Sequence, residues 1–268
     1  MIKRLFGATG AEVPVVGQGT WHMGESRRAE RDEVAALRLG LDLGLTHIDT
    51  AEMYGDGGAE RIVAQAIKGY PRESLFVVTK VLPSNASYAG TIKACEQSLK
   101  RLGTDHIDVY LIHWWSSQHP IADAMRAMET LVMRGLTRFV GVSNFDVDQM
   151  NQARAALGSA RLACNQVLYH LRDRAIEREL VPHCEREKVA IVGYTPLARG
   201  GFLRDAVVEI AKRHGRTPRQ VALNFLTRRA GLFTIPKASQ PEHVRENAGA
   251  LDFRLSPEEL RAIDRATA

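Results

Sequence analysis

Short apolar runs alternate with longer amphipathic stretches along this chain. Eight apolar runs have the length and β-branched content of buried strands, at 15–19, 46–49, 75–80, 107–113, 139–143, 163–167, 189–194 and 232–236. Stretches with helical spacing of apolar residues lie between them, for example 33–44, 91–103, 122–135 and 218–231. Several of these end in a glycine, a common helix stop: Gly44, Gly103, Gly135 and Gly231.

This alternation predicts a (β/α)8 TIM barrel. Dividing 268 residues over eight units gives about 33 residues each, the size of a βα unit in such a barrel. A doubly wound sheet would more often begin with a GxGxxG turn, and GQGTWHMG (17–24) breaks that motif. The opening stretch 4–17 predicts a β-hairpin, turned at Ala8-Thr9-Gly10, that plugs the barrel bottom. We find no linker, so we expect one domain over 1–268.

Composition narrows the class of protein. The chain is 45% hydrophobic and 25% charged, has no apolar run of membrane-spanning length, and starts without a signal-peptide pattern. Cys95, Cys164 and Cys184 are scattered, which favours reduced thiols over a disulfide framework or a zinc site. We therefore expect a cytoplasmic protein with no membrane partner.

The formal net charge of +5 admits nucleic-acid binding as one interpretation. Acidic residues, however, are interleaved with the basic ones, as in RRAERDE, and no block of five like charges occurs. A mildly basic surface with a local anion site is the better interpretation. We expect no nucleic-acid partner.

Polar residues follow the apolar runs, at the barrel end where the chemistry of such folds occurs. They are Asp49 with Tyr54 in its loop, Lys80, His113 followed by Trp114, Ser143-Asn144, Gln166, Tyr194 and Lys237. Each alone is more often a structural ion pair or a packed side chain. Four titratable groups on three consecutive strands are harder to explain as packing, because burying Asp and Lys without partners costs several kcal/mol.

These groups suggest proton transfer. An ammonium about 4 Å from a phenol favours the phenolate by about 4 kcal/mol at an effective dielectric near 20, before desolvation opposes it. Lys80 would thereby bring Tyr54 toward the range of a useful acid, Asp49 would hold Lys80, and His113 would orient a substrate oxygen. No metal is required. A Schiff-base lyase would need a depressed Lys80 pKa, and Asp49 would raise it.

Proton transfer to a substrate oxygen needs an accompanying hydride, and so a cofactor. Tyr194 offers a ring for stacking, and Ser143, Asn144 and Gln166 offer the donors and acceptors that a carboxamide needs. Lys237 and the helix that starts near Pro241 can take a phosphate.

The chain resembles the aldo-keto reductases, nearest the bacterial branch that includes methylglyoxal reductases. The matching stretches are GQGTW (17–21), HIDTAEMYGDG (47–57), VVTKV (77–81), LIHWW (111–115), GVSNF (141–145), NQVLYH (165–170), GYTPLARG (193–200), IPKASQPEHVRENA (235–248) and ENAGALDF (246–253). The resemblance implies reduction of aldehydes and ketones with NADPH.

The resemblance also implies residue roles. The catalytic residues would be Asp49, Tyr54, Lys80 and His113, with Tyr54 as general acid. Cofactor contacts would come from Thr20, Asp49, Ser143, Asn144, Gln166, Tyr194, Lys237, Ala238, Ser239, His243, Glu246 and Asn247. Trp21 and Trp114 would line the substrate pocket. Family members are often monomers, so we expect a monomer.

Two departures from the family qualify these expectations. Many NADPH-preferring relatives have an arginine where this chain has His243, so we expect a weakened preference for NADPH and possible use of NADH. The sequence stops at Ala268, and the loop after Tyr194 is short. We therefore expect an open pocket, a loosely clasped cofactor and a broad range of small reactive carbonyls.

Some assignments stay open at this stage. A nicotinamide-binding regulatory module with little turnover is an alternative from another class. Trp115 either lines the pocket or packs beneath the following loop, and His22 either rims the site or has a plain loop role.

Overall fold

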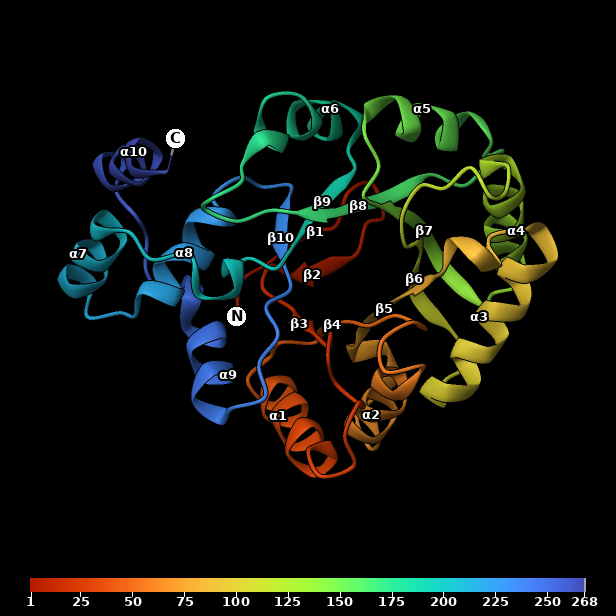
Figure 1. The fold of residues 1–268 in the computed structure, drawn as a ribbon, viewed down its shortest axis with the longest axis horizontal. Coiled ribbons are helices and arrows are strands. Elements are labelled where there is room, and N and C mark those ends of the chain that lie inside the picture. The colour runs from red at the N-terminus through yellow and green to blue at the C-terminus, as the bar shows by residue number, and fades with distance from the viewer. Residues whose placement is uncertain (268) are drawn as a thin grey trace.

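The computed structural model describes residues 1–267, and its centre is a barrel of eight parallel strands (Figure 1). The strands are β3 (Gln18–Gly19), β4 (His47–Asp49), β5 (Phe76–Val81), β6 (Ile107–Ile112), β7 (Thr137–Ser143), β8 (Leu162–Leu168), β9 (Ala190–Tyr194) and β10 (Leu232–Thr234). They pair in chain order, and the bridges Val16–Thr234 and Gly19–Lys237 join the first strand to the last. Each predicted run overlaps one of these strands, so the predicted (β/α)8 fold is confirmed.

Helices surround the strands (Figure 1). They are α1 (Glu30–Asp42), α2 (Gly58–Ile67), α3 (Tyr88–Leu102), α4 (Ile121–Met133), α5 (Val147–Ala155), α6 (Leu180–Glu187), α7 (Asp205–His214), α8 (Pro218–Leu226), α9 (Pro241–Ala248) and α10 (Pro257–Ala266). Both α7 and α8 lie between β9 and β10, and α7 packs on α8 and α10 outside the ring. Within residues 1–267, no helix is long and apolar enough to cross a membrane.

Three of the four predicted glycine stops are correct. Gly44, Gly103 and Gly135 follow α1, α3 and α4 with φ between 63° and 88°, the left-handed region in which glycine is unstrained. The prediction for Gly231 is wrong, because α8 already ends at Leu226. There Thr227 donates its hydroxyl back to the carbonyl of Leu223, and irregular chain leads on to β10.

An N-terminal hairpin closes the end of the barrel at which the strands begin. Its strands β1 (Lys3–Leu5) and β2 (Glu12–Pro14) are antiparallel, and the predicted turn lies between them. Phe6 is fully buried, and its ring lies 4.9–5.9 Å from the rings of His47, Phe76 and Phe233. The hairpin therefore plugs the barrel bottom, as predicted.

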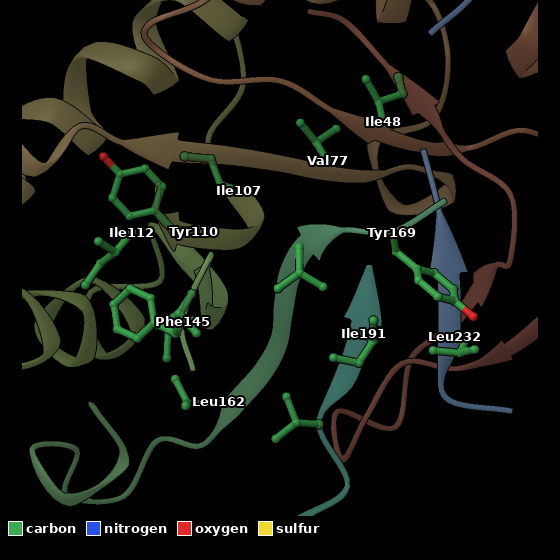
Figure 2. Packing of buried hydrophobic residues seen from close by; sticks show 14 of the residues in the cluster. Ile48, Val77, Ile107, Tyr110, Ile112, Phe145, Leu162, Tyr169, Ile191 and Leu232 are labelled. Atoms are coloured by element: carbon green, nitrogen blue, oxygen red, sulfur yellow. The ribbon is translucent and has the colours of Figure 1, made fainter. Parts of the chain in front are cut away.

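The strands alternate their side chains between two apolar layers. Ile48, Val77, Ile107, Ile191 and Leu232 belong to the outer layer between strands and helices (Figure 2). Val78, Val109 and Leu111 belong to the inner layer that fills the barrel.

This alternation places the polar groups at the strand ends. Lys80 lies two residues after Val78, and His113 lies two residues after Leu111, so both continue the inward-facing rows. Asp49 is the last residue of β4 and follows the outward-facing Ile48. Strand periodicity thus brings these three side chains to the inside of one barrel end.

Candidate active site

A cavity of about 580 Å³ opens at the carboxyl ends of the strands. It is lined by the following predicted site residues: Thr20, Trp21, Asp49, Tyr54, His113, Trp114, Ser143, Asn144, Gln166, Tyr194 and Lys237. The walls thus come from the ends of β3, β4 and β6 through β10 and the loops that follow them, which is the usual place for a site in this fold.

Asp49, Lys80 and Tyr54 form a connected group at the floor of the cavity. Lys80 is fully buried, and its Nζ donates to Asp49 Oδ1 at 2.7 Å and to the Thr50 carbonyl at 2.7 Å. The same Nζ lies 3.4 Å from the Tyr54 hydroxyl and 4.9 Å from the centre of its ring. Gln166 Nε2 donates to Asp49 Oδ2 at 2.7 Å, so both carboxylate oxygens are satisfied.

The protonation of this group follows from its burial and its charges. Burial alone would lower the pKa of Lys80, but Asp49 and Tyr54 outweigh burial and raise it. Burial raises the pKa of Asp49, and Lys80 opposes that rise. With Lys80 at hydrogen-bonding distance, the pair is a buried ion pair. The raised Lys80 pKa agrees with the expectation that argued against a Schiff-base nucleophile.

The Tyr54 phenol behaves differently from the expectation. Burial raises its pKa above the ordinary value of 10, and the nearby Lys80 only partly offsets that rise. The predicted shift toward neutrality is therefore reversed in the structure, because desolvation outweighs the attraction of an ammonium that lies 3.4 Å away. Tyr54 is a protonated phenol throughout the neutral range, which is the form that can donate a proton.

His113 lies beside this phenol as a neutral imidazole. Its ring centre is 5.7 Å from that of Tyr54, and burial lowers its pKa to about 3, with Lys80 adding to the effect. His113 Nδ1 is buried and has no hydrogen-bond partner in the described chain, residues 1–267, which leaves Nε2 as the nitrogen available to a ligand in the cavity. The arrangement can offer two donors, Tyr54 and His113, to one oxygen atom.

The residues predicted to hold a carboxamide also converge. Ser143 donates to the Gln166 carbonyl at 2.9 Å, and Tyr194 donates its hydroxyl to Asn144 Oδ1 at 2.9 Å. Asn144 adopts a left-handed φ of 59° and donates to the His113 carbonyl at 3.1 Å. Gln166 Oε1 has no hydrogen-bond partner within residues 1–267, so it is available to a ligand amide.

Aromatic side chains form the outer part of the cavity. Trp21 and Trp114 are each 38% exposed and line the cavity together with Met53, which no sequence motif indicated. Two neighbouring aromatic residues, Trp115 and His22, lie outside the lining of this cavity. Trp115 packs edge-on against Phe145 outside the cavity lining, and His22 stacks on Trp21 while Nδ1 contacts Glu25 at 2.8 Å.

The loop after β9 contributes more than its length suggested. Leu197, Arg199 and Phe202 line the cavity, and the Arg199 guanidinium lies 4.9 Å from the centre of the Trp21 ring. This loop therefore contacts the segment that follows β3. No pattern in the sequence indicated the contact, since the two residues are far apart in the chain.

The predicted phosphate end is only partly assembled at the cavity. Lys237 lines it and donates to Ser239 Oγ at 3.1 Å. The remaining predicted residues of this region are outside the lining: Ala238, Ser239, His243, Glu246 and Asn247. Arg219, which no motif indicated, lines the cavity instead and pairs with Glu246. Asn247 Oδ1 is buried and has no hydrogen-bond partner among residues 1–267.

Metal chemistry has no candidate ligand set in the described part of the chain. Within residues 1–267, no three His, Cys, Asp or Glu side chains lie close enough together to hold a metal ion. The cavity therefore offers the acid–base group, the uncharged donors around it, and the cations Arg199, Arg219 and Lys237.

The fold and the position of the cavity define a (β/α)8-barrel protein with an acid–base site at the carboxyl ends of its strands. The sequence model of the aldo/keto reductase family matches residues 15–268, and the chain belongs to this family.

Individual relatives agree with this assignment. Methylglyoxal reductase YeaE of Escherichia coli K12 is 46% identical over 260 residues, which cover 95% of this chain and 91% of that protein. A crystal structure of the Klebsiella pneumoniae aldo/keto reductase in complex with NADP and acetate matches with a TM-score of 0.93 and 45% identity, over 100% of this chain and 96% of that one. A K. pneumoniae aldo-keto reductase in complex with NADPH has the same score and identity, over 100% and 95% of the two chains. The resemblance to methylglyoxal-reducing bacterial members is thus confirmed.

Proposed function

We propose that this protein reduces aldehydes and ketones to alcohols with NADPH, and that residues 1–268 form one aldo-keto reductase domain. The observation that carries the proposal is the buried, protonated Tyr54 phenol, which lies 3.4 Å from Lys80 and beside the neutral His113 at the floor of the cavity. The methylglyoxal reductase named among its relatives supports small reactive carbonyls as substrates.

The chain's own residues would deliver the proton. When bound, NADPH supplies the hydride that reduces the carbonyl carbon. Tyr54 donates its proton to the carbonyl oxygen, and His113 Nε2 donates a hydrogen bond to the same oxygen as negative charge develops there. Lys80, held by Asp49, stabilises the phenolate that remains. One hydride and one proton thus convert the carbonyl to an alcohol.

The cavity residues fit the cofactor that this reaction needs. Gln166 Oε1, Asn144 and Ser143 would hold the carboxamide, Tyr194 would stack on the nicotinamide, and Thr20 would lie at its ribose. Lys237, Ala238, Ser239, His243, Glu246 and Asn247 would serve the adenosine end, for which the unpartnered Asn247 Oδ1 is a suitable acceptor. We propose Asp49, Tyr54, Lys80 and His113 as the catalytic residues, with Trp21 and Trp114 as substrate contacts.

The outer wall of the cavity and the three cysteine thiols support our proposals on substrate range and cellular location. An outer wall that is largely aromatic and partly exposed favours a broad range of small carbonyls. The three cysteines are free and buried, which agrees with our proposal of a cytoplasmic location. We further propose a monomer with no nucleic-acid partner.

A spectrophotometric assay tests the proposal directly. Methylglyoxal and simple aromatic aldehydes should oxidise NADPH in the presence of the wild-type protein. Tyr54→Phe should lower kcat by about 10²- to 10⁴-fold, the contribution of a general acid, and should leave cofactor affinity close to that of the wild type. A regulatory module would bind the cofactor and show no turnover with any carbonyl, and near-normal kcat in Tyr54→Phe would remove the general-acid assignment.

A further inference from the structure

We infer that Arg219 supplies the guanidinium that holds the 2′-phosphate of the cofactor and thereby sets a strong preference for NADPH over NADH. This inference rests on the proposed function, because it names the specificity residue of the same cavity. It runs against the weaker preference expected from His243 alone.

Arg219 lies at the N-terminal end of α8, on the wall of the cavity. It is the second residue of α8, and it lines the cavity together with Lys237, which follows β10. His243 and Arg245, on α9, are both outside the cavity lining. Lys237 and Arg219 therefore offer two cations to an anionic group in the cavity, whereas the guanidinium of Arg199, which also lines the cavity, lies over the Trp21 ring.

Glu246 of α9 holds the Arg219 guanidinium in place. Arg219 Nε lies 2.9 Å from Glu246 Oε2, and the two side chains are only 18% and 19% exposed. Gln220 Nε2 donates to the Glu246 carbonyl at 3.2 Å, which ties α8 to α9 at the same point. Arg219 Nη1 and Nη2 make no hydrogen bond to any residue in 1–267. Glu246 thus fixes the side chain through Nε, and the Nη groups stay available.

The terminal Nη1 and Nη2 nitrogens of Arg219 have the geometry to bind a phosphate. Two terminal guanidinium nitrogens match two oxygens of a phosphate, and this bidentate geometry is specific to arginine. Lys237 adds a second positive charge nearby. Two cations against the single carboxylate of Glu246 leave one net positive charge, which suits a phosphomonoester and gives no comparable gain with the ribose hydroxyl of NADH.

Two other roles would give Arg219 the same position. The residue could be a purely structural ion pair between α8 and α9, or it could stack on the adenine ring, which both cofactors share. Only a 2′-phosphate contact makes the effect of removing Arg219 depend on the phosphate. The discriminating quantity is therefore the ratio of NADP⁺ to NAD⁺ affinity and not the activity of the enzyme.

The experiment measures the dissociation constants of NADP⁺ and NAD⁺ by calorimetric titration of the wild type and of Arg219→Ala. The loss of charge-assisted hydrogen bonds that contribute about 1.5–3 kcal/mol raises a dissociation constant by roughly 10- to 150-fold. We expect NADP⁺ binding to weaken by that factor, NAD⁺ binding to change less than about threefold, and Arg219→Lys to fall between. The matched control is Arg216→Ala. Arg216 precedes α8 by two residues, its guanidinium lies over the Phe253 ring, and it is outside the cavity lining.

A fragment titration separates phosphate from adenine without the nicotinamide. Adenosine 2′,5′-bisphosphate and 5′-AMP differ only in the 2′-phosphate, so Arg219→Ala should weaken the first and spare the second. If Arg219→Ala lost the same affinity for both members of each pair, NADP⁺ and NAD⁺ or the bisphosphate and 5′-AMP, Arg219 would contact a group that both members share, such as the adenine ring, and the inference would be overturned. If a folded variant kept all four affinities, Arg219 would be a structural ion pair, and the inference would be overturned too. A wild type that binds neither dinucleotide would instead refute the proposed function, so the two failures are distinguishable.

Discussion

The Tyr54 phenol experiences two opposing effects, and their balance determines the pH range in which it can act. Lys80 favours the phenolate, whereas burial among apolar neighbours favours the neutral phenol and is the larger effect, so the pKa is raised. The sequence revealed the ammonium but not the extent of desolvation, which depends on how the whole cavity is packed. The rise in the Lys80 pKa could therefore be expected from its partner Asp49, whereas the direction of the Tyr54 pKa shift could not be predicted from the strand ends.

This balance predicts the pH dependence of catalysis. Reduction needs a protonated Tyr54, and burial raises the pKa of this phenol above its ordinary value, so kcat/KM should fall only at alkaline pH. Burial lowers the pKa of His113 to about 3, so His113 should not titrate between about pH 5 and 9. We expect a flat profile over that range for methylglyoxal reduction, measured in buffers of constant ionic strength.

The reverse reaction provides the control for this profile. Alcohol oxidation needs the deprotonated Tyr54 as a base, so its rate should rise with pH where the reduction rate begins to fall. An acid limb near pH 6.5 in the reduction profile would contradict the assignment, because it would mean that His113 titrates at its ordinary pKa.

At the scale of elements, the strands were the predictable part of the structure. Period-two alternation along β5 and β6 carries the inward rows into Lys80 and His113, so the sequence alone could indicate that these residues meet. Element boundaries outside the strands were less predictable. The extra helix α7 and the early end of α8 depend on packing against α10 and on a capping threonine.

Two cavity residues from segments between the strands were not predicted, for a related reason. Arg199 and Arg219 approach the cavity from the loop after β9 and from the start of α8, and neither position follows an apolar run directly. Their neighbours Trp21 and Glu246 are distant in the chain. Such contacts depend on how loops fold over the barrel end, and no local pattern encodes them.

The hairpin leads to a stability prediction. Phe6 is fully buried among His47, Phe76 and Phe233, so Phe6→Ala should lower the free energy of unfolding by about 3–5 kcal/mol. Urea denaturation followed by circular dichroism measures the loss. The neighbouring Leu5 is 60% exposed, and Leu5→Ala should change stability by less than about 0.5 kcal/mol. Similar losses in both variants would show that the hairpin does not act as a packed plug.

At the scale of the whole molecule, the cavity depends on closure of the barrel. Every strand end except that of β5 contributes to its lining. The β5 residue Lys80 lies behind this lining, where it contacts both Asp49 and Tyr54. The first and last strands meet at the Gly19–Lys237 bridge, and both residues line the cavity. A ligand that spans the cavity would therefore contact segments from the two ends of the barrel sheet, and local opening at this seam would disrupt its site.

Cofactor binding should consequently stabilise the barrel as a unit. A ligand at 100 times its dissociation constant adds about 2.7 kcal/mol to the stability of the folded state. For a chain of this size, that corresponds to a rise in Tm of roughly 5–10 °C, measurable by scanning calorimetry with NADP⁺. Tyr54→Phe should show the same rise, because it removes a proton donor and leaves the cofactor contacts in place. A rise in the wild type that disappears in Tyr54→Phe would mean that Tyr54 contributes to cofactor binding, and its loss of activity could then no longer be assigned to proton transfer.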